Sequence, residues 1–161
     1  MRYFFVLSFS LLFLSVAAFA QEPQELLEPI ELRLERTIEI GRAGKTTRFC
    51  AHPADDPESR TIGLMFQENL PELGGMIFDF GINDVVHMWM RNTVLSLDMI
   101  FINEAWEVVK IAKNTTPFSL AIISSDLPVR RVLEINAGIS EKYNIKVGDK
   151  VTLGEINCVL P

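Results

Sequence analysis

Apolar and polar residues alternate with a period of two in the stretch that begins at residue 30. Over residues 30–40, Ile and Leu side chains alternate with Glu, Arg and Thr side chains. This period is typical of a β-strand with one buried face. Turn residues at 41–44 and a second strand-like stretch at 46–51 predict that the two segments form a hairpin.

Short apolar stretches bounded by Gly, Pro, Asn or Asp continue to the end of the chain and predict further strands. They cover residues 76–80, 86–90, 97–102, 106–112, 132–135, 147–153 and 155–160. Helices do not alternate with these stretches, which argues against a parallel doubly wound sheet. We therefore expect an α+β, β-rich fold, with eight or nine strands in a curled, mostly antiparallel sheet or a small barrel.

About two short helices complete the predicted fold. Asp56 is placed to cap the first helix and Pro57 suits its first turn, so this helix is expected to run to about Phe66. The second helix is expected over residues 140–143, with Ser140 as its cap.

The first 20 residues have the three parts of a secretory signal peptide. Arg2 precedes an apolar run, and Ala18-Phe19-Ala20 places small residues at a cleavage site. The run is short for a transmembrane helix, which needs roughly 20 apolar residues, so retention as an anchor is the lesser alternative. We expect a signal peptide at 1–20, a linker at 21–29 and one domain at 30–161. After cleavage we expect no stable membrane span, and a periplasmic or secreted location.

Charge and cysteine content limit the partners. Lys and Arg total 15 against 21 Asp and Glu, a net charge of −6, and no basic stripe is visible, so nucleic acid is not expected to bind. In an oxidising compartment Cys50 and Cys158 could form a disulfide, or they could remain as buried free thiols. Their spacing matches no redox or zinc motif, and we predict no metal site and no cofactor.

The densest group of polar and aromatic residues is at 87–93, with the sequence His-Met-Trp-Met-Arg-Asn-Thr. On a strand, His87, Trp89 and Arg91 would share one face. A titratable ring, an aromatic ring and a cation together resemble one wall of a small-molecule site. The alternative is a half-exposed strand with a core Trp and a solvated Arg.

Two carboxylates lie inside apolar stretches, at Asp98 and Glu134. A buried carboxylate is costly unless it is paired, and Arg60 and Arg91 are candidate partners. If the two carboxylates were brought together, they could act as acid and base. Alternatively, each could form a structural ion pair or accept backbone amide hydrogen bonds, and no catalytic residue is assigned.

Several short motifs follow one another in a characteristic order. They are Gly-Leu-Met-Phe at 63–66, Gly-Met-Ile-Phe-Asp-Phe at 75–80, Trp-Met-Arg-Asn-Thr at 89–93 with Leu-Asp at 97–98, Val-Leu-Glu-Ile at 132–135 and Gly-Asp at 148–149. In this order and spacing the chain resembles the uncharacterised ACR family, domain of unknown function 192, over roughly residues 37–155. The resemblance implies a small exported bacterial protein and no established reaction.

The chain departs from the pattern of that family at several positions. Ser59 stands where Glu is usual before Arg60, Gln67 where Arg is common, Met88 where Phe is usual, and Ser96 where Pro is usual. A catalytic role for the family's Glu-Arg pair would not fit Ser59. The candidate binding residues are therefore Arg60, His87, Trp89, Arg91, Asn92, Asp98 and Glu134.

These features predict an exported domain that binds a small polar ligand, or a segment of an envelope polymer, beside residues 89–92. One alternative is an envelope hydrolase that uses Asp98 and Glu134 as acid and base. Another is a protein-interaction module with an exposed strand or a Met-rich face formed by Met76, Met88 and Met90. The binding function is favoured because no nucleophile–base pair is visible.

Overall fold

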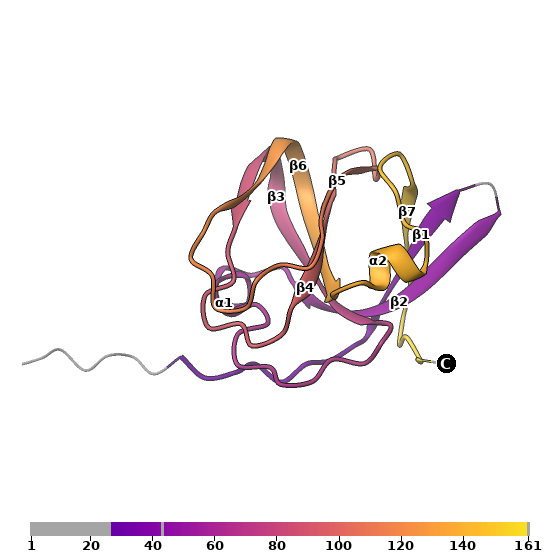
Figure 1. The fold of residues 1–161 in the computed structure, drawn as a ribbon. Coiled ribbons are helices and arrows are strands. Elements are labelled where there is room, and N and C mark those ends of the chain that lie inside the picture. Colours follow the sequence, from indigo (N-terminus) through magenta and orange to yellow (C-terminus); the bar gives the residue numbers. More distant parts are fainter. Residues whose placement is uncertain (1–26, 43, 161) are drawn as a thin grey trace, which may run out of the picture.

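The computed structural model describes residues 27–42 and 44–160, which form one curled sheet with two short helices (Figure 1). The predicted signal peptide and most of the predicted linker lie outside the described residues. The strands are β1 (Arg36–Arg42), β2 (Lys45–Ala54), β3 (Gly74–Met88), β4 (Leu97–Ile102), β5 (Val108–Ala112), β6 (Ile123–Asn136) and β7 (Lys150–Ile156), and the helices are α1 (Pro57–Ile62) and α2 (Ile139–Lys142).

The strands lie in the order β5-β4-β6-β3-β2-β1-β7, with the long strands β3 and β6 paired at the centre. The predicted mostly antiparallel sheet is confirmed, with one exception. β2 and β3 pair in parallel, because the connection between them, which contains α1, carries the chain back to the end at which β2 began.

The two outermost strands approach each other without closing the sheet into a barrel. Figure 1 shows the start of β5 beside the start of β7. The N–H of Val108 donates to the carbonyl of Asp149 over 2.9 Å, and the N–H of Val151 donates to the carbonyl of Trp106 over 2.9 Å. These bonds hold the sheet in its curled shape.

Both faces of the sheet are covered by apolar side chains. One face carries the first core, which includes Ile38, Ile40, Phe49, Ile100, Leu133 and Ile135. The other face carries the second core, which includes Leu64, Met76, Phe78, Met99, Phe101 and Val132. β6 contributes alternately to both cores, so neighbouring residues of this strand point to opposite faces.

The predicted N-terminus of α1 is correct, and its predicted end is wrong. Asp56 caps the helix by accepting a hydrogen bond of 2.9 Å from the N–H of Ser59. The helix ends at Ile62 rather than near Phe66, because Gly63 and Phe66 have positive φ values of 54° and 62°. In α2 the cap position is Gly138 rather than Ser140.

Three strand predictions also need correction. Residues 30–34 form no strand, and Ile30 and Leu32 instead pack against the second core. The stretches predicted at 76–80 and 86–90 belong to one strand, β3, because pairing with β6 resumes after a bulge between Asp79 and Asp84. The two stretches predicted after residue 147 likewise form a single strand, β7, giving seven strands among the described residues.

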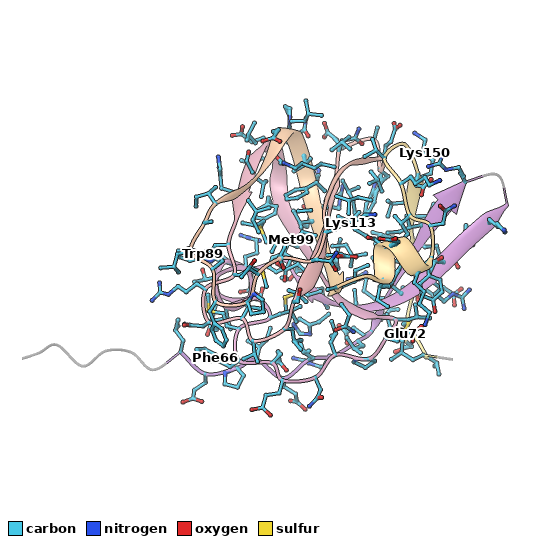
Figure 2. The ribbon with its side chains drawn as sticks, viewed as in Figure 1. Phe66, Glu72, Trp89, Met99, Lys113 and Lys150 are labelled. Atoms are coloured by element: carbon cyan, nitrogen blue, oxygen red, sulfur yellow. A yellow bond between two sulfur atoms is a disulfide. The ribbon has the colours of Figure 1, made fainter. Side chains whose placement is uncertain are left out.

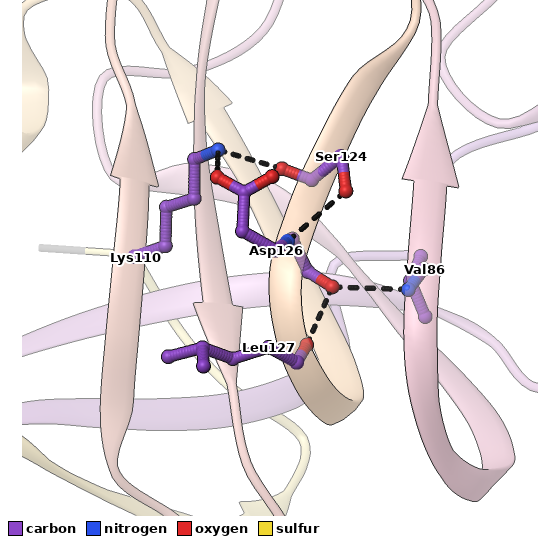
Figure 3. Close-up of polar contacts among 6 residues, drawn as sticks. Val86, Lys110, Ser124, Asp126 and Leu127 are labelled. Atoms are coloured by element: carbon purple, nitrogen blue, oxygen red, sulfur yellow. Dashed lines mark hydrogen bonds and ion pairs between the residues drawn. The ribbon is translucent and has the colours of Figure 1, made fainter.

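A second irregularity in the β3–β6 pairing lies between Val85 and His87. On the β6 side, the Oγ of Ser125 accepts from the N–H of Val86 over 3.0 Å and donates to the carbonyl of Leu127 over 2.6 Å (Figure 3). The ammonium group of Lys110 binds the carboxylate of Asp126 over 2.5 Å. The Ser125 hydrogen bonds thus join β3 to β6 at this irregularity, and the Lys110–Asp126 pair joins β6 to β5.

A disulfide joins Cys50 of β2 to Cys158, which follows β7, with Cα atoms 5.5 Å apart. It links the middle of the sheet to the end of the chain. Of the described residues, none forms a helix with the length and hydropathy that crossing a membrane would require.

Replacing both Cys50 and Cys158 by Ser is expected to lower the free energy of unfolding by about 4 kcal/mol, because the cross-link spans 108 residues of the unfolded chain. Guanidinium unfolding of the oxidised protein and of the double variant would measure the difference. Equal unfolding midpoints would show that the disulfide adds no stability.

Candidate functional site

A small pocket opens on the second-core face, between α1 and the end of β3. Its volume is about 90 Å³. Five of the seven candidate binding residues line it, namely Arg60, His87, Trp89, Arg91 and Glu134. Asn92 and Asp98 are not among its lining residues.

The segment after β3 forms one wall of this pocket. Burial alternates here as the sequence predicts, with Met88 and Met90 buried and the intervening side chains exposed. Trp89 is 41% exposed and lies at the outer rim of the fold, whereas Met99 lies in the interior (Figure 2). The guanidinium carbon of Arg91 is 5.5 Å from the centre of the Trp89 ring, so an aromatic face and a cation lie together at the mouth.

Glu134 is the buried ionisable residue among those that line this pocket, with only 4% of its surface exposed. It lies on β6 between Met76 of β3 and Met99 of β4, which are its direct neighbours across the sheet. None of the described residues forms a hydrogen bond or an ion pair with its carboxyl group. Burial raises the pKa of Glu134 to about 8, so this carboxyl is mostly neutral at pH 7.

A neutral carboxyl at the edge of a pocket can donate one hydrogen bond and accept others. The expected pairing with Arg60 or Arg91 is absent from the described part of the chain. The Nη1 atom of Arg60 instead donates to the backbone carbonyls of Asp55 (2.7 Å) and Asp79 (3.0 Å). Arg60 therefore binds the backbone beside the pocket and does not pair with Glu134.

Asn92 does not line the pocket but contacts the turn that follows α1. Its φ of 54° turns the chain, and its carbonyl accepts from the N–H of Phe66 over 2.9 Å. Its Nδ2 atom lies 3.8 Å from the sulfur of Met65. These contacts join the turn after α1 to the segment that carries Trp89.

Asp98 is fully buried on the opposite face from Glu134. It pairs with Ile135 of β6, whereas Glu134 pairs with Met99, so the two carboxylates point away from each other. Asp98 accepts hydrogen bonds from the N–H of Asn114 (2.9 Å), the N–H of Ser140 (3.0 Å) and the Oγ of Ser140 (2.6 Å). This carboxylate therefore ties α2 to β4, and it cannot act with Glu134 as acid and base on one substrate.

The turn at residues 63–65 and the rings of Phe78 and Phe80 also line the pocket, and none of them is among the predicted binding residues. These residues belong to the Gly-Leu-Met and Phe-Asp-Phe motifs, which are the features of the sequence that could have identified them as pocket residues. The Met-rich face is not a surface, because Met76, Met88 and Met90 are all buried.

The geometry thus defines a β-rich domain with a small pocket that encloses a buried carboxyl group. The chain belongs to the DUF192 family, described as Uncharacterized ACR, whose model matches residues 38–153. No curated protein matches the chain.

Two solved structures share both the fold and part of the sequence. A protein from Sinorhizobium meliloti 1021, provisionally described as a transcription regulator, is 36% identical, with a TM-score of 0.74 over 78% of this chain and 98% of its own. A protein of unknown function from Novosphingobium aromaticivorans DSM 12444 is 34% identical, with a TM-score of 0.70 over 72% of this chain and 83% of its own.

The buried carboxyl makes stability depend on pH. Because the folded-state pKa of Glu134 is raised from 4.5 to about 8, the native state binds one more proton than the unfolded state between those values. Relative to Glu134→Gln, the wild type should lose about 1 kcal/mol per pH unit as the pH rises through this window. Urea unfolding of both proteins at pH 5, 6, 7 and 8 would measure this, and a constant difference would contradict it.

Asp98→Asn should lower the free energy of unfolding by about 2 kcal/mol, because an amide nitrogen would face N–H and O–H donors in place of a carboxylate oxygen. Urea unfolding would measure the loss. Unchanged stability would show that these hydrogen bonds do not hold α2.

Proposed function

We propose that this domain binds the polar end group of a small molecule, or of an envelope polymer segment, in the pocket beside Trp89. The observation that carries the proposal is the Glu134 carboxyl, which is buried at a pocket and has no hydrogen-bond partner among the described residues. A buried polar group without a partner is costly, and a ligand that both donates and accepts hydrogen bonds would remove that cost.

The size of the pocket limits the ligand. A volume of about 90 Å³ is well below the roughly 300–1,000 Å³ of sites that enclose a whole small molecule. The pocket therefore suits one end group, such as an amide or a hydroxyl-bearing group. The rest of the ligand would lie outside, against the exposed ring of Trp89 and the guanidinium of Arg91.

An exposed apolar rim beside the mouth supports binding of a ligand that extends beyond the pocket. Phe66, Val94 and Phe118 are exposed, and backbone hydrogen bonds tie Phe66 to Asn92 and Phe118 to Thr93. A sugar ring or a peptide side chain could lie on this rim. The proposed setting is the periplasm or the exterior, since disulfides persist in oxidising compartments.

The same rim favours a second candidate function, that of a protein-interaction module. Phe118, Leu120 and Ile122 are 60%, 66% and 61% exposed in the connection before β6. Exposed apolar side chains so close together are more typical of an interaction surface than of a solvated loop. This candidate needs no role for Glu134, which separates it from the first.

Binding can be tested through the side-chain N–H signals of the two tryptophans in ¹⁵N correlation spectra. N-acetylglucosamine, N-acetylmuramyl dipeptide and short alanine peptides are suitable ligands. We expect at least one of them to shift the Trp89 signal in a saturable way. Arg91→Ala should weaken this binding, whereas Lys45→Ala at the far end of the β1–β2 hairpin should not.

Glu134→Met is the sharpest variant, because Met matches the two side chains that flank Glu134 in the sheet. It should weaken binding about tenfold or more while leaving the free energy of unfolding at pH 7 unchanged or higher by about 2 kcal/mol. Unchanged affinity in Glu134→Met would contradict the proposal. Absence of any Trp89 shift would contradict it as well and would direct attention to the 118–122 surface.

A further inference from the structure

A larger cleft lies on the first-core face of the sheet, away from Glu134. Its volume is about 400 Å³. Ile77, Asp79 and Arg131 line it from the face opposite Glu134, since Asp79 and Arg131 are cross-strand partners. Its polar and charged side chains are those of Arg36, Asp55, Arg60, Asp79, Arg130 and Arg131, and its aromatic side chains are those of Phe80 and Trp106.

Positive charge exceeds negative charge in this cleft, with four arginines against two aspartates. Arg130 and Arg131 share a single carboxylate, that of Asp79, with Nε–Oδ distances of 3.1 and 3.0 Å. Arg60 donates to backbone carbonyls, and Arg36 forms no ion pair within the described part of the chain. Two guanidinium charges are therefore left without a matching carboxylate.

Arg131 is the most constrained of these cations. It is only 8% exposed, and its guanidinium carbon lies 3.7 Å from the centre of the Trp106 ring. Its Nη1 atom is buried and has no hydrogen-bond partner in the described part of the chain. A buried guanidinium donor without an acceptor is costly, so the site lacks an acceptor that a bound anion could supply.

The carboxylate of Asp79, which pairs with Arg130 and Arg131, does not meet this need. Burial disfavours the charged form of Asp79, but the N–H of Gly81 and the two arginines outweigh it and lower the pKa of Asp79. Asp79 is thus ionised and already accepts from Gly81, Arg130 and Arg131. A further anion is required if Arg36 and Arg131 are to be neutralised fully.

The walls and the volume indicate the kind of anion. About 400 Å³ falls within the range of sites that enclose a small molecule. Trp106, Phe80 and Ile77 provide flat or apolar contact area beside the guanidinium groups. The planar fork of N–H donors on a guanidinium group matches two oxygens of a carboxylate or of a phosphate.

We propose that this cleft is a second binding site, for a small anion that carries a carboxylate or phosphate group together with a flat apolar group. The proposal does not rest on the Glu134 pocket. The two sites share Arg60 and Phe80 as a common wall, but each has its own tryptophan, Trp106 here and Trp89 at the pocket.

The probes are benzoate and phenyl phosphate, with benzamide as a neutral control and benzamidine as a cationic control. Binding is followed by the indole N–H signals, assigned with Trp89→Phe. Benzoate, phenyl phosphate or both should shift the Trp106 signal in a saturable way and leave Trp89 in place. The probe that binds with the higher affinity identifies the preferred anionic group. The affinity of that probe should fall as the salt concentration rises.

Arg36→Gln should weaken binding about tenfold through the loss of one charge-assisted interaction. This substitution breaks no ion pair of the described structure. Arg131→Lys should also weaken binding, because Lys keeps the charge but loses the planar fork. Lys45→Gln removes the same charge at the other end of the hairpin, where Lys45 faces Arg42, and should bind the probes like the wild type.

Three results would each overturn the proposal. The first is the absence of a Trp106 shift with either anion up to about 20 mM, well above the range of specific binding. The second is an equal response to benzamide or benzamidine. The third is an affinity in Arg36→Gln equal to that of Lys45→Gln. A shift at Trp89 alone would support the pocket described above and reject this cleft.

Discussion

The antiparallel pairing of β3 with β6 is the constraint on which the other features of this structure depend. It sets Met76 opposite Glu134 and Asp79 opposite Arg131, so one ladder supplies the key residues of both proposed sites. The pairing requires Gly75, since a Cβ atom at this position would lie 2.6 Å from the backbone oxygen of Glu134. Because neighbouring residues of a strand point to opposite faces, this register also places the two sites on opposite sides of the sheet.

Three carboxyl groups of the domain have different surroundings: Asp98 and Glu134 are buried, whereas Asp79 is half-buried. Asp98 is satisfied by N–H and O–H donors of its own chain, and Asp79 is paired with two arginines. Glu134 has neither kind of partner among the described residues and is kept neutral by burial. Arg131 is the cationic counterpart, since one of its nitrogens is buried without an acceptor. Glu134 and Arg131 are therefore the two residues on which the two proposed sites depend.

The two sites lie on opposite faces of the sheet, and one residue of α1 and one of β3 line both of them. Arg60 and Phe80 border both, and Arg60 is held by the backbone carbonyls of Asp55 and Asp79. α1 carries Arg60, and the cap formed by Asp56 and the buried Ser59 fixes the start of that helix. The Oγ of Ser59 donates to the Asp56 carboxylate over 2.6 Å, so Ser59 takes part in this cap.

Local patterns in the sequence determined the elements that need only local interactions. The short apolar stretch at 97–102 coincides with β4 and Asp56 caps α1. His87, Trp89 and Arg91 lie on one side of their segment. Alternation failed at residues 30–34, because an apolar stretch can pack against a core without a strand partner. Only the tertiary structure decided that Asp98 and Glu134 point to opposite faces and that Arg131 lies against Trp106. The physical reason is that strand register and partner choice are set by interactions between distant segments, whereas periodicity reports only which residues of one segment share a face.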